Sequence, residues 1–289
     1  MTLPTLSTAR APGVIAEPPE TWSAHAAPPG AVPGVDGRAA AARPVLDAGD
    51  ARAVLAAARG ILFDLDGTLI RTDEVIDGAR EVLAAYGQRA MILSNNSSDS
   101  AEGLSLRLAR AGLDVAAPRI VLAGVETVRA VAALRPGART MMLASAALVC
   151  EARALGLHVG DERPDVVLVA RTPAFDYAAL ERAANAIRAG AEFVVANPDT
   201  SHPGAFGRLV PETGALAAAI AAAAGTSPAR VFGKPEPDLF RAALGRLGLA
   251  AGEVVMVGDN PDTDGAGARR LGIPHILIGE GLPLRALLG

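Results

Sequence analysis

"ILFDLDGTLI", residues 61–70, is the stretch that decides how this chain folds. A short apolar run of this kind is typical of a buried strand, and this one ends in Asp64 and Asp66, followed at once by glycine and threonine. Because side chains alternate along an extended segment, the two carboxylates lie on one side and Leu65 points to the other. An acidic turn would explain a bare Asp-x-Asp, but D-x-D-G-T after a fully apolar strand is much rarer. We therefore interpret the two acids as a site for one cation or one substrate.

Helical and strand-like patterns alternate from about residue 46 onward. The strand-like runs "ILFDL", "AMILS", "EFVVA" and "VVMVG" are separated by alanine-rich helical stretches with Asp, Ser or Thr near their starts. This alternation predicts an α/β protein with a Rossmann-like, largely parallel sheet flanked by helices. Ligands of such sheets bind beyond the carboxyl ends of the strands, so chemistry is expected there.

Polar residues follow two further segments in a way that fits anion binding. "RAMILSNNSSDS" predicts a buried strand ending at Ser94, then Asn95 and a helix start near Asp99; hydroxyls, amides and free N–H groups at such a turn can hold an anion. In "VFGKPEPDLF", Lys234 stands between glycine and proline before a helix beginning near Pro237, where a fixed ammonium can neutralise a phosphate. A polar capping loop and a solvated lysine are the ordinary alternatives.

The fourth segment, "VVMVGDNPDTD" at residues 254–264, places Asp259 directly after an apolar strand. Asp262 and Asp264 follow it. An acidic turn explains Asp262, but not an acid placed immediately behind the strand. Carboxylates are hard oxygen ligands that suit Mg²⁺.

Composition excludes several classes of function. The chain has 289 residues, and 27 Lys and Arg against 31 Asp and Glu give a net charge of −4, so there is no basic field for nucleic acid. No stretch approaches the roughly 20 apolar residues of a membrane span, and the N-terminus lacks the pattern of a signal peptide. The single cysteine, Cys150, excludes an internal disulfide, favours a cytoplasmic location, and is predicted to be a small buried filler.

Taken in order, "DLDGT", "SNN", "GKP" and "GDNPDTD" resemble the four motifs of the haloacid dehalogenase-like hydrolase superfamily. Residues 196–220 are similar to the cap signature of its class IIA (C2-capped) subfamily, which includes 4-nitrophenylphosphatases and nucleotide or pyridoxal phosphate phosphatases. The resemblance covers the chain from about residue 50 to its end. "MMLASAAL" departs from the glycine-bearing cap segment of that subfamily.

Composition and the resemblance together predict a chain organised in three parts. A catalytic core is expected over residues 46–138 and 229–289, with a smaller α/β cap domain inserted at 139–228. Residues 1–45 are rich in proline and show no helical or strand period, which predicts an extension that is disordered or draped over the domain.

The resemblance also implies a role for each candidate residue. Asp64 is expected to be the nucleophile that forms an aspartyl-phosphate, and Asp66 the acid and base. Mg²⁺ is expected to be held by Asp64, the Asp66 carbonyl and Asp259, and the phosphate by Ser94, Asn95 and Lys234. Asp264 is expected to orient Asp259, its waters or Lys234. In the cap, substrate selection is expected from Asn197, Asp199 and His202.

These features predict a Mg²⁺-dependent phosphatase of a small phosphorylated metabolite. An alkoxide leaving group needs a proton and a halide does not, so Asp66 favours ester hydrolysis over dehalogenation. Two alternatives stay open: a phosphotransferase or mutase on the same core, and a catalytically silent binding or regulatory protein. No nucleic acid or membrane partner is expected. A homodimer formed through the cap is plausible, because members of this family often dimerise in that way.

Overall fold

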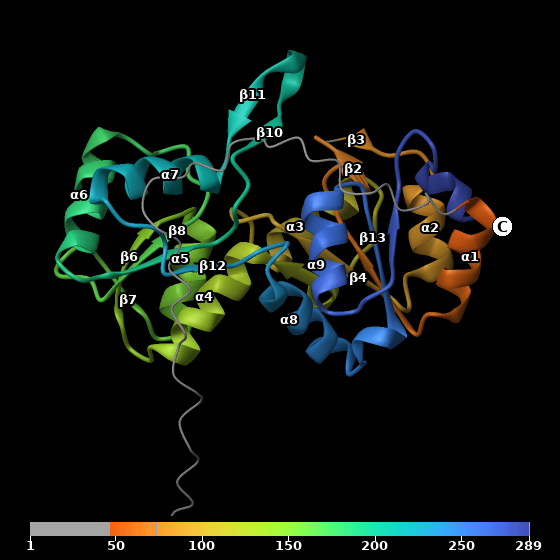
Figure 1. Cartoon of the computed structure of the whole chain (residues 1–289), viewed down its shortest axis with the longest axis horizontal. Helices are drawn as coiled ribbons and strands as arrows, with labels where there is room; N and C mark the ends of the chain where they lie inside the picture. The colour runs from red at the N-terminus through yellow and green to blue at the C-terminus, as the bar shows by residue number, and fades with distance from the viewer. Residues whose placement is uncertain (1–46, 73, 289) are drawn as a thin grey trace, which may run out of the picture.

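The computed structural model describes residues 47–72 and 74–288. The prediction for the proline-rich residues 1–45 lies outside this described part of the chain. The described residues form two five-stranded parallel sheets, each accompanied by helices (Figure 1). The predicted α/β architecture with a largely parallel sheet is therefore confirmed.

The first sheet has the order β14-β13-β1-β4-β5, so the strand that carries the opening motif lies at its centre. Of its two neighbours, β4 is the next strand of this sheet along the chain, whereas β13 comes from the C-terminal part. The strands of this sheet are β1 (Gly60–Phe63), β4 (Ala90–Ser94), β5 (Ile120–Leu122), β13 (Val254–Gly258) and β14 (His275–Leu277).

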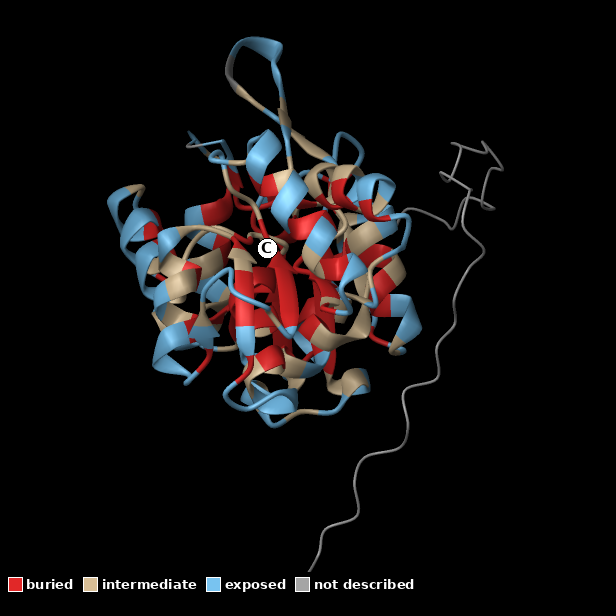
Figure 2. Cartoon of the chain, turned by 90° about the vertical axis from the view of Figure 1, so that its left-hand side faces the viewer, coloured by how far each residue is buried: buried red, intermediate tan, exposed pale blue. Residues whose placement is uncertain are grey.

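Helices cover both faces of the first sheet, and the alternation of side chains along β1 explains how. Ile61 and Phe63 belong to the same buried cluster as Leu55, whereas Leu62 packs in a separate cluster with Phe240. Figure 2, which views the chain from the side of the second unit, shows buried residues on central strands and exposed residues on the outer helix faces and loops. The helices of the first unit are α1 (Ala48–Ala57), α2 (Ala79–Tyr86), α3 (Ala101–Arg110), α4 (Ala123–Leu134), α8 (Pro237–Leu247) and α9 (Ala266–Arg270).

Helix starts follow the predicted capping chemistry. Ser100 caps α3, because its hydroxyl accepts from the backbone N–H of Gly103 at 3.0 Å, so this helix starts just after the predicted Asp99. α8 begins at Pro237 as predicted, with the proline in the first turn where its missing N–H costs nothing.

The second sheet has the order β12-β9-β8-β6-β7. It runs from Arg139 to Val231 and so extends past the predicted cap limit at residue 228; the division into core and cap at these boundaries stays our proposal. Its strands are β6 (Arg139–Leu143), β7 (His158–Val159), β8 (Val166–Val169), β9 (Glu192–Val195) and β12 (Arg230–Val231). Its helices are α5 (Ala146–Ala154), α6 (Tyr177–Arg188) and α7 (Thr213–Ala224).

Cys150 is exposed on α5, so the prediction of a buried filler was wrong. Leu148 and Ala152 are the buried residues of this helix. Because they are four positions apart they share one face, and a residue two positions from each lies on the opposite face.

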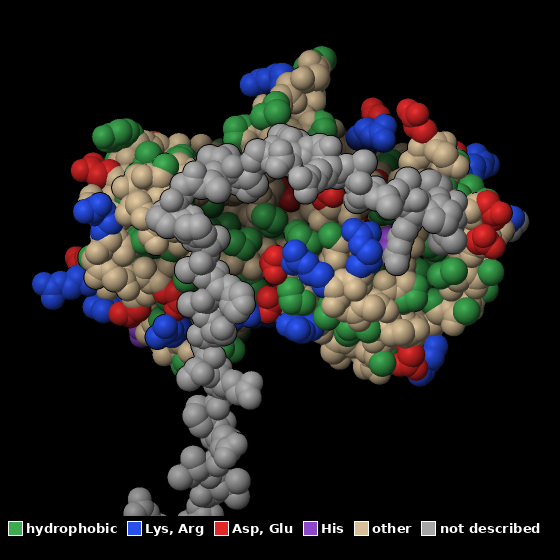
Figure 3. Space-filling model, viewed as in Figure 1, with side chains coloured by type: hydrophobic (Ala, Val, Ile, Leu, Met, Phe, Trp, Pro, Cys, Tyr) green, Lys and Arg blue, Asp and Glu red, His purple; other side chains and the backbone are tan. Residues whose placement is uncertain are grey.

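A hairpin stands out from the second unit (Figure 1). It is formed by β10 (Ser201–Pro203) and β11 (Leu209–Pro211), and hydrophobic side chains project from it (Figure 3). Phe206 and Leu209 are exposed there. The remaining short elements are β2 (Ile70–Arg71), β3 (Glu74–Val75), four 3₁₀ turns (Ala117–Arg119, Ala205–Gly207, Ala251–Glu253, Leu284–Leu287) and a π-helical turn (Pro261–Gly265). Among the described residues, no helix combines the length and hydrophobicity needed to cross a membrane.

Candidate active site

Three strands of the first sheet deliver the predicted site residues to one edge. Asp64 directly follows β1, Ser94 is the last residue of β4, and Asp259 directly follows β13. Because β4 and β13 both run parallel to β1 and flank it, their carboxyl ends meet at the same place.

Lys234 joins two buried carboxylates at this edge. Its Nζ donates to Oδ1 of Asp64 at 2.5 Å and to Oδ1 of Asp264 at 2.6 Å. All three residues are buried, with exposed fractions of 5% for Asp64, 2% for Lys234 and 1% for Asp264. Thr68 Oγ1 donates to the other oxygen of Asp64 at 3.3 Å. A buried ammonium therefore fixes the orientation of the predicted nucleophile.

Burial sets the charge states of this group. Desolvation raises the pKa of Asp64 to about 8, since the opposing attraction of Lys234 is partly offset by repulsion from Asp264. Burial by itself lowers the pKa of Lys234, but Asp264 and Asp64 outweigh it and hold that pKa above its usual range. Lys234 therefore stays cationic, whereas Asp64 needs further positive charge to ionise fully at neutral pH.

A divalent cation fits the chemistry of the donor set. One carboxylate oxygen from each of Asp64, Asp259 and Asp264 lies within 4.8 Å of the other two. Three carboxylates and one ammonium leave an excess of negative charge, and hard oxygen ligands are those that Mg²⁺ prefers. Lys234 pairs with one oxygen of Asp64 and one oxygen of Asp264, so its charge reduces the negative charge of this group of acids without cancelling it.

Two glycines make room for these acids. A Cβ atom at Gly67 would lie 2.1 Å from Oδ2 of Asp259, and its φ of +89° is one that L side chains rarely adopt. A Cβ atom at Gly258 would lie 2.2 Å from Oδ2 of Asp264. The glycine of D-x-D-G-T thus serves the approach of Asp259 as well as the turn expected from the sequence.

Asp66 lies at the accessible side of the site and is exposed, unlike Asp64. The surrounding protein still desolvates its carboxyl group enough to raise its pKa, although nearby Lys234, Arg107 and His202 act in the opposite direction. A raised pKa keeps the proton on a carboxyl group to higher pH, which suits a group that donates a proton.

The predicted phosphate-binding residues on β4 lie next to Lys234, but their side chains differ in availability. Ser94 Oγ is buried and accepts from the backbone N–H of Asn96 at 3.1 Å, which leaves its O–H to donate. Asn95 Oδ1 accepts from the backbone N–H of Lys234 at 2.6 Å, and its Nδ2 donates to Lys234 O and Asp199 Oδ2, both at 3.0 Å. The Asn95 amide thus binds protein groups.

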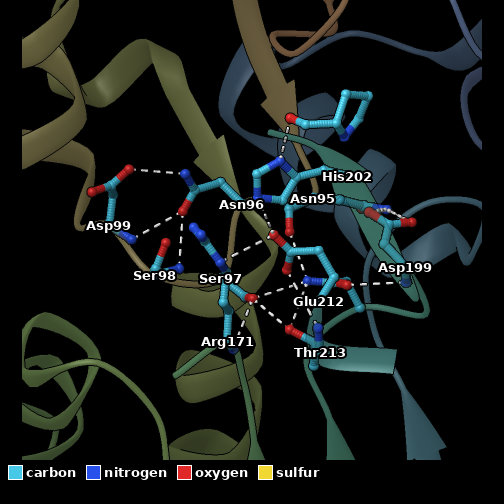
Figure 4. Close-up of polar contacts among 12 residues, drawn as sticks. Asn95, Asn96, Ser97, Ser98, Asp99, Arg171, Asp199, His202, Glu212 and Thr213 are labelled. Atoms are coloured by element: carbon cyan, nitrogen blue, oxygen red, sulfur yellow. Dashed lines mark hydrogen bonds and ion pairs between the residues drawn. The ribbon is translucent and has the colours of Figure 1, made fainter. Parts of the chain in front are cut away.

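Of the three cap residues predicted to select substrate, His202 keeps 39% of its side chain exposed, although its Nε2 is buried. Its Nδ1 lies 2.9 Å from Pro203 O and its Nε2 3.5 Å from Glu212 Oε1, which also pairs with Arg171 Nε at 3.2 Å (Figure 4). Asn197 is buried, and Asp199 accepts from Asn95. The sequence did not single out Arg171 or Glu212, although Glu212 lies within the cap signature at residues 196–220, because each is an ordinary charged residue in a loop.

Comparisons with known proteins show the family of this chain. A family model for haloacid dehalogenase-like hydrolases matches residues 58–272. The chain is 32% identical to a dihydroxyacetone phosphatase of Corynebacterium glutamicum, over 76% of this chain and 81% of that protein. It is also 32% identical to an acid sugar phosphatase of Staphylococcus aureus, over 78% of this chain and 87% of that protein.

Two solved structures are similar as well. One is a glycerol phosphate phosphatase from Mycobacterium tuberculosis in complex with calcium, with a TM-score of 0.74 and 31% identity over 81% of this chain and 76% of that one. The other is a p-nitrophenyl phosphatase from Archaeoglobus fulgidus, with a TM-score of 0.73 and 28% identity over 80% of this chain and 90% of that one. The Mycobacterium tuberculosis protein has also been solved with magnesium.

Proposed function

This chain belongs to the haloacid dehalogenase-like hydrolase family and is a phosphoric monoester hydrolase, and from that premise we propose that Asp64 attacks the phosphorus of a small phosphorylated sugar or related metabolite. The observation that carries this proposal is the group formed by Asp64, Lys234, Asp264 and Asp259 at the carboxyl edge of the first sheet. The relatives named for dihydroxyacetone, acid sugars and glycerol phosphate favour a short polyhydroxylated leaving group.

In the first half of the reaction, an Asp64 oxygen forms a bond to phosphorus while the bond from phosphorus to the leaving oxygen breaks. Asp66 donates its proton to that oxygen, so the alcohol leaves neutral and an aspartyl-phosphate stays on the enzyme. Lys234 holds Asp64 in line, and its charge together with the Ser94 hydroxyl stabilises the phosphoryl oxygens.

In the second half, the Asp66 carboxylate takes a proton from water, whose oxygen attacks phosphorus. The bond to Asp64 then breaks, which releases inorganic phosphate and restores both acids. Mg²⁺ held by Asp64, the Asp66 carbonyl and Asp259 would offset the repulsion between an anionic nucleophile and an anionic ester. Asp264 orients Lys234.

The purified protein is expected to hydrolyse 4-nitrophenyl phosphate and short sugar phosphates, to lose this activity in EDTA, and to regain it when Mg²⁺ is restored. Release of inorganic phosphate is the measurement, with heat-treated protein as the blank. Activity that is indifferent to EDTA would rule out the metal. Labelled phosphate that passes to an added alcohol in place of water would favour the phosphotransferase alternative.

Mg²⁺ should stabilise the protein more at high pH than at low pH. Because the pKa of Asp64 rises from 3.8 to about 8 on folding, the folded state binds the extra proton between these values, and this group's contribution to stability falls as pH rises. A cation competes with that proton for the ionised carboxylate. The rise in melting temperature on adding Mg²⁺ should therefore be larger at about pH 8.5 than at about pH 5.5. NaCl at the same ionic strength is the control for general salt effects. After this correction, an equal rise in melting temperature at both pH values would contradict the prediction.

Two further expectations stay predictions. The molecular mass of the protein in solution would show whether it forms the homodimer expected through the cap. A cytoplasmic location rests on the single cysteine of the sequence.

A further inference from the structure

We propose that Asn197 is a positioning residue, which acts from the cap on the core loop at residues 95–97 and, through Asn95, on Lys234 and the nucleophile. This inference rests on the proposed function. This role differs from the substrate selection expected from the sequence. A positioning residue should affect the rate by the same factor whichever leaving group the substrate carries.

The side chain of Asn197 has its polar atoms engaged within the protein. It is 1% exposed, and its Nδ2 donates to Asn95 O at 2.8 Å and to Ser97 Oγ at 2.9 Å, with Thr213 Oγ1 at 3.2 Å. Its Oδ1 accepts from the backbone N–H of Asp199 at 3.1 Å. An amide has two donor hydrogens, which these contacts use, and the side chain is too deeply buried to reach a substrate.

Asn95 connects this contact to the catalytic group. Its carbonyl accepts from Asn197, its Oδ1 accepts from the backbone N–H of Lys234 at 2.6 Å, and its Nδ2 donates to Lys234 O at 3.0 Å. Lys234 in turn donates to Asp64. Hydrogen bonds joined through the covalent frames of Asn95 and Lys234 therefore connect the cap to the carboxylate of Asp64.

Gly233, Asn95 and Asn197 are closely packed against one another. Gly233 has φ +75°, and a Cβ atom there would lie 2.8 Å from Asn95 Oδ1 and 2.9 Å from the Cβ of Asn197. In a close-packed interior a displacement is transmitted to its neighbours. Loss of the Asn197 amide should thus let the Asn95 loop shift and carry Lys234 away from its place beside Asp64.

Other bonds keep the two units joined when Asn197 is truncated. Ser97 Oγ and Thr213 Oγ1 lie 2.8 Å apart, and Ser97 Oγ also accepts from the backbone N–H of Arg171 at 3.1 Å (Figure 4). Ser145 Oγ donates to Ser98 O at 2.6 Å. A variant at position 197 is therefore expected to fold, and its kinetics can be compared with those of the wild type.

The test compares Asn197→Ala with Asn185→Ala, a matched change at an exposed position of α6 in the same unit. Asn197→Ala is expected to lower kcat about 10- to 100-fold, as losses of supporting hydrogen bonds do at catalytic centres, and to change KM little. The factor should be the same for 4-nitrophenyl phosphate and for each sugar phosphate. A KM effect that varies with the leaving group would show contact with substrate and overturn the inference.

Two further measurements separate positioning from a purely structural role. In a double-mutant cycle with Asn95→Ala, the two losses of kcat should be less than additive, because Asn197 acts through Asn95. Binding of beryllium fluoride, a mimic of the aspartyl-phosphate, should weaken in Asn197→Ala and stay unchanged in Asn185→Ala. Additive losses in the cycle, or unchanged binding of the mimic by Asn197→Ala, would overturn the inference.

The inference and the proposed function fail differently. Wild-type protein that neither hydrolyses monoesters nor binds beryllium fluoride overturns both. Wild-type protein that does both, beside a folded Asn197→Ala variant with the same kcat and the same affinity for the mimic, overturns the inference alone.

Discussion

Asp64→Asn should lower kcat by about 10⁵-fold, the scale seen when a catalytic nucleophile is removed. An amide oxygen has almost the shape of a carboxylate oxygen but is a poor nucleophile, so the phosphoenzyme cannot form. The fold should survive, because the amide in this variant still offers an oxygen to Lys234, which also keeps Asp264 as a partner. Above about pH 8 the melting temperature of Asp64→Asn should be no lower than that of the wild type. The reason is that burial makes the ionised Asp64 of the wild type costly at that pH, whereas the amide stays neutral.

The matched control is Asp262→Asn, an exposed acid of the same segment as Asp259 that has no role in the proposed reaction. It should keep wild-type kcat. Single-turnover measurement of inorganic phosphate separates true loss of chemistry from slow product release. Residual turnover above a hundredth of wild type in a homogeneous Asp64→Asn preparation would rule out Asp64 as nucleophile.

Lys234→Met should destabilise the protein as well as inactivate it. The ammonium it removes is 2% exposed and lies 2.5 Å and 2.6 Å from the oxygens of Asp64 and Asp264. Removing one partner of a buried ion pair leaves uncompensated charge, which costs about 3–5 kcal/mol of unfolding free energy. Loss of its electrostatic stabilisation of the transition state should lower kcat by about 10²- to 10³-fold.

The pH dependence of this loss has a definite sign. Lys234 lowers the pKa of Asp64, so its removal raises that pKa further above the unfolded value of 3.8. Below about pH 8 Asp64 is protonated in both folded proteins, so the higher pKa adds no cost there; the added cost appears as pH rises above about 8, where the wild-type carboxyl group ionises beside Lys234 and that of the variant does not. Chemical denaturation at several pH values measures it.

Arg182→Met is the control for Lys234→Met, because it removes a surface ion pair with Asp161 whose partners are about half exposed. It should change the unfolding free energy by less than about 1 kcal/mol. A loss in Lys234→Met no larger than that of the control would show that the buried pair contributes little. Lys234→Arg should not rescue activity, since a planar guanidinium does not replace a compact ammonium between two carboxylates.

The fold was predictable because its information is local. The strands β1, β4 and β13 are apolar runs that end at or just before a glycine or polar residue, and the rule that parallel strands end at one edge brings Asp64, Ser94 and Asp259 together from the sequence alone. Composition also singles out a residue of the site, because Lys234 is the only lysine among the 27 Lys and Arg residues.

The connection between core and cap was not predictable in the same way. Asn95 and Asn197 are about a hundred positions apart, and each is an ordinary loop residue until packing places them against Gly233. The buried state of Asn197 and the engagement of the Asn95 amide depend on that packing. A sequence pattern can nominate polar residues for a site, but it does not say whether their donors face a ligand or another loop.

The order of strands in the first sheet also fixes when the protein becomes active during its synthesis. The register pairs Gly60 with Val254, so β1 waits for a neighbour that leaves the ribosome almost two hundred residues after it. Until then one edge of a fully buried strand is open to pairing with another nascent chain, a known hazard of long-range parallel sheets. Catalysis is accordingly among the last properties that the growing polypeptide acquires.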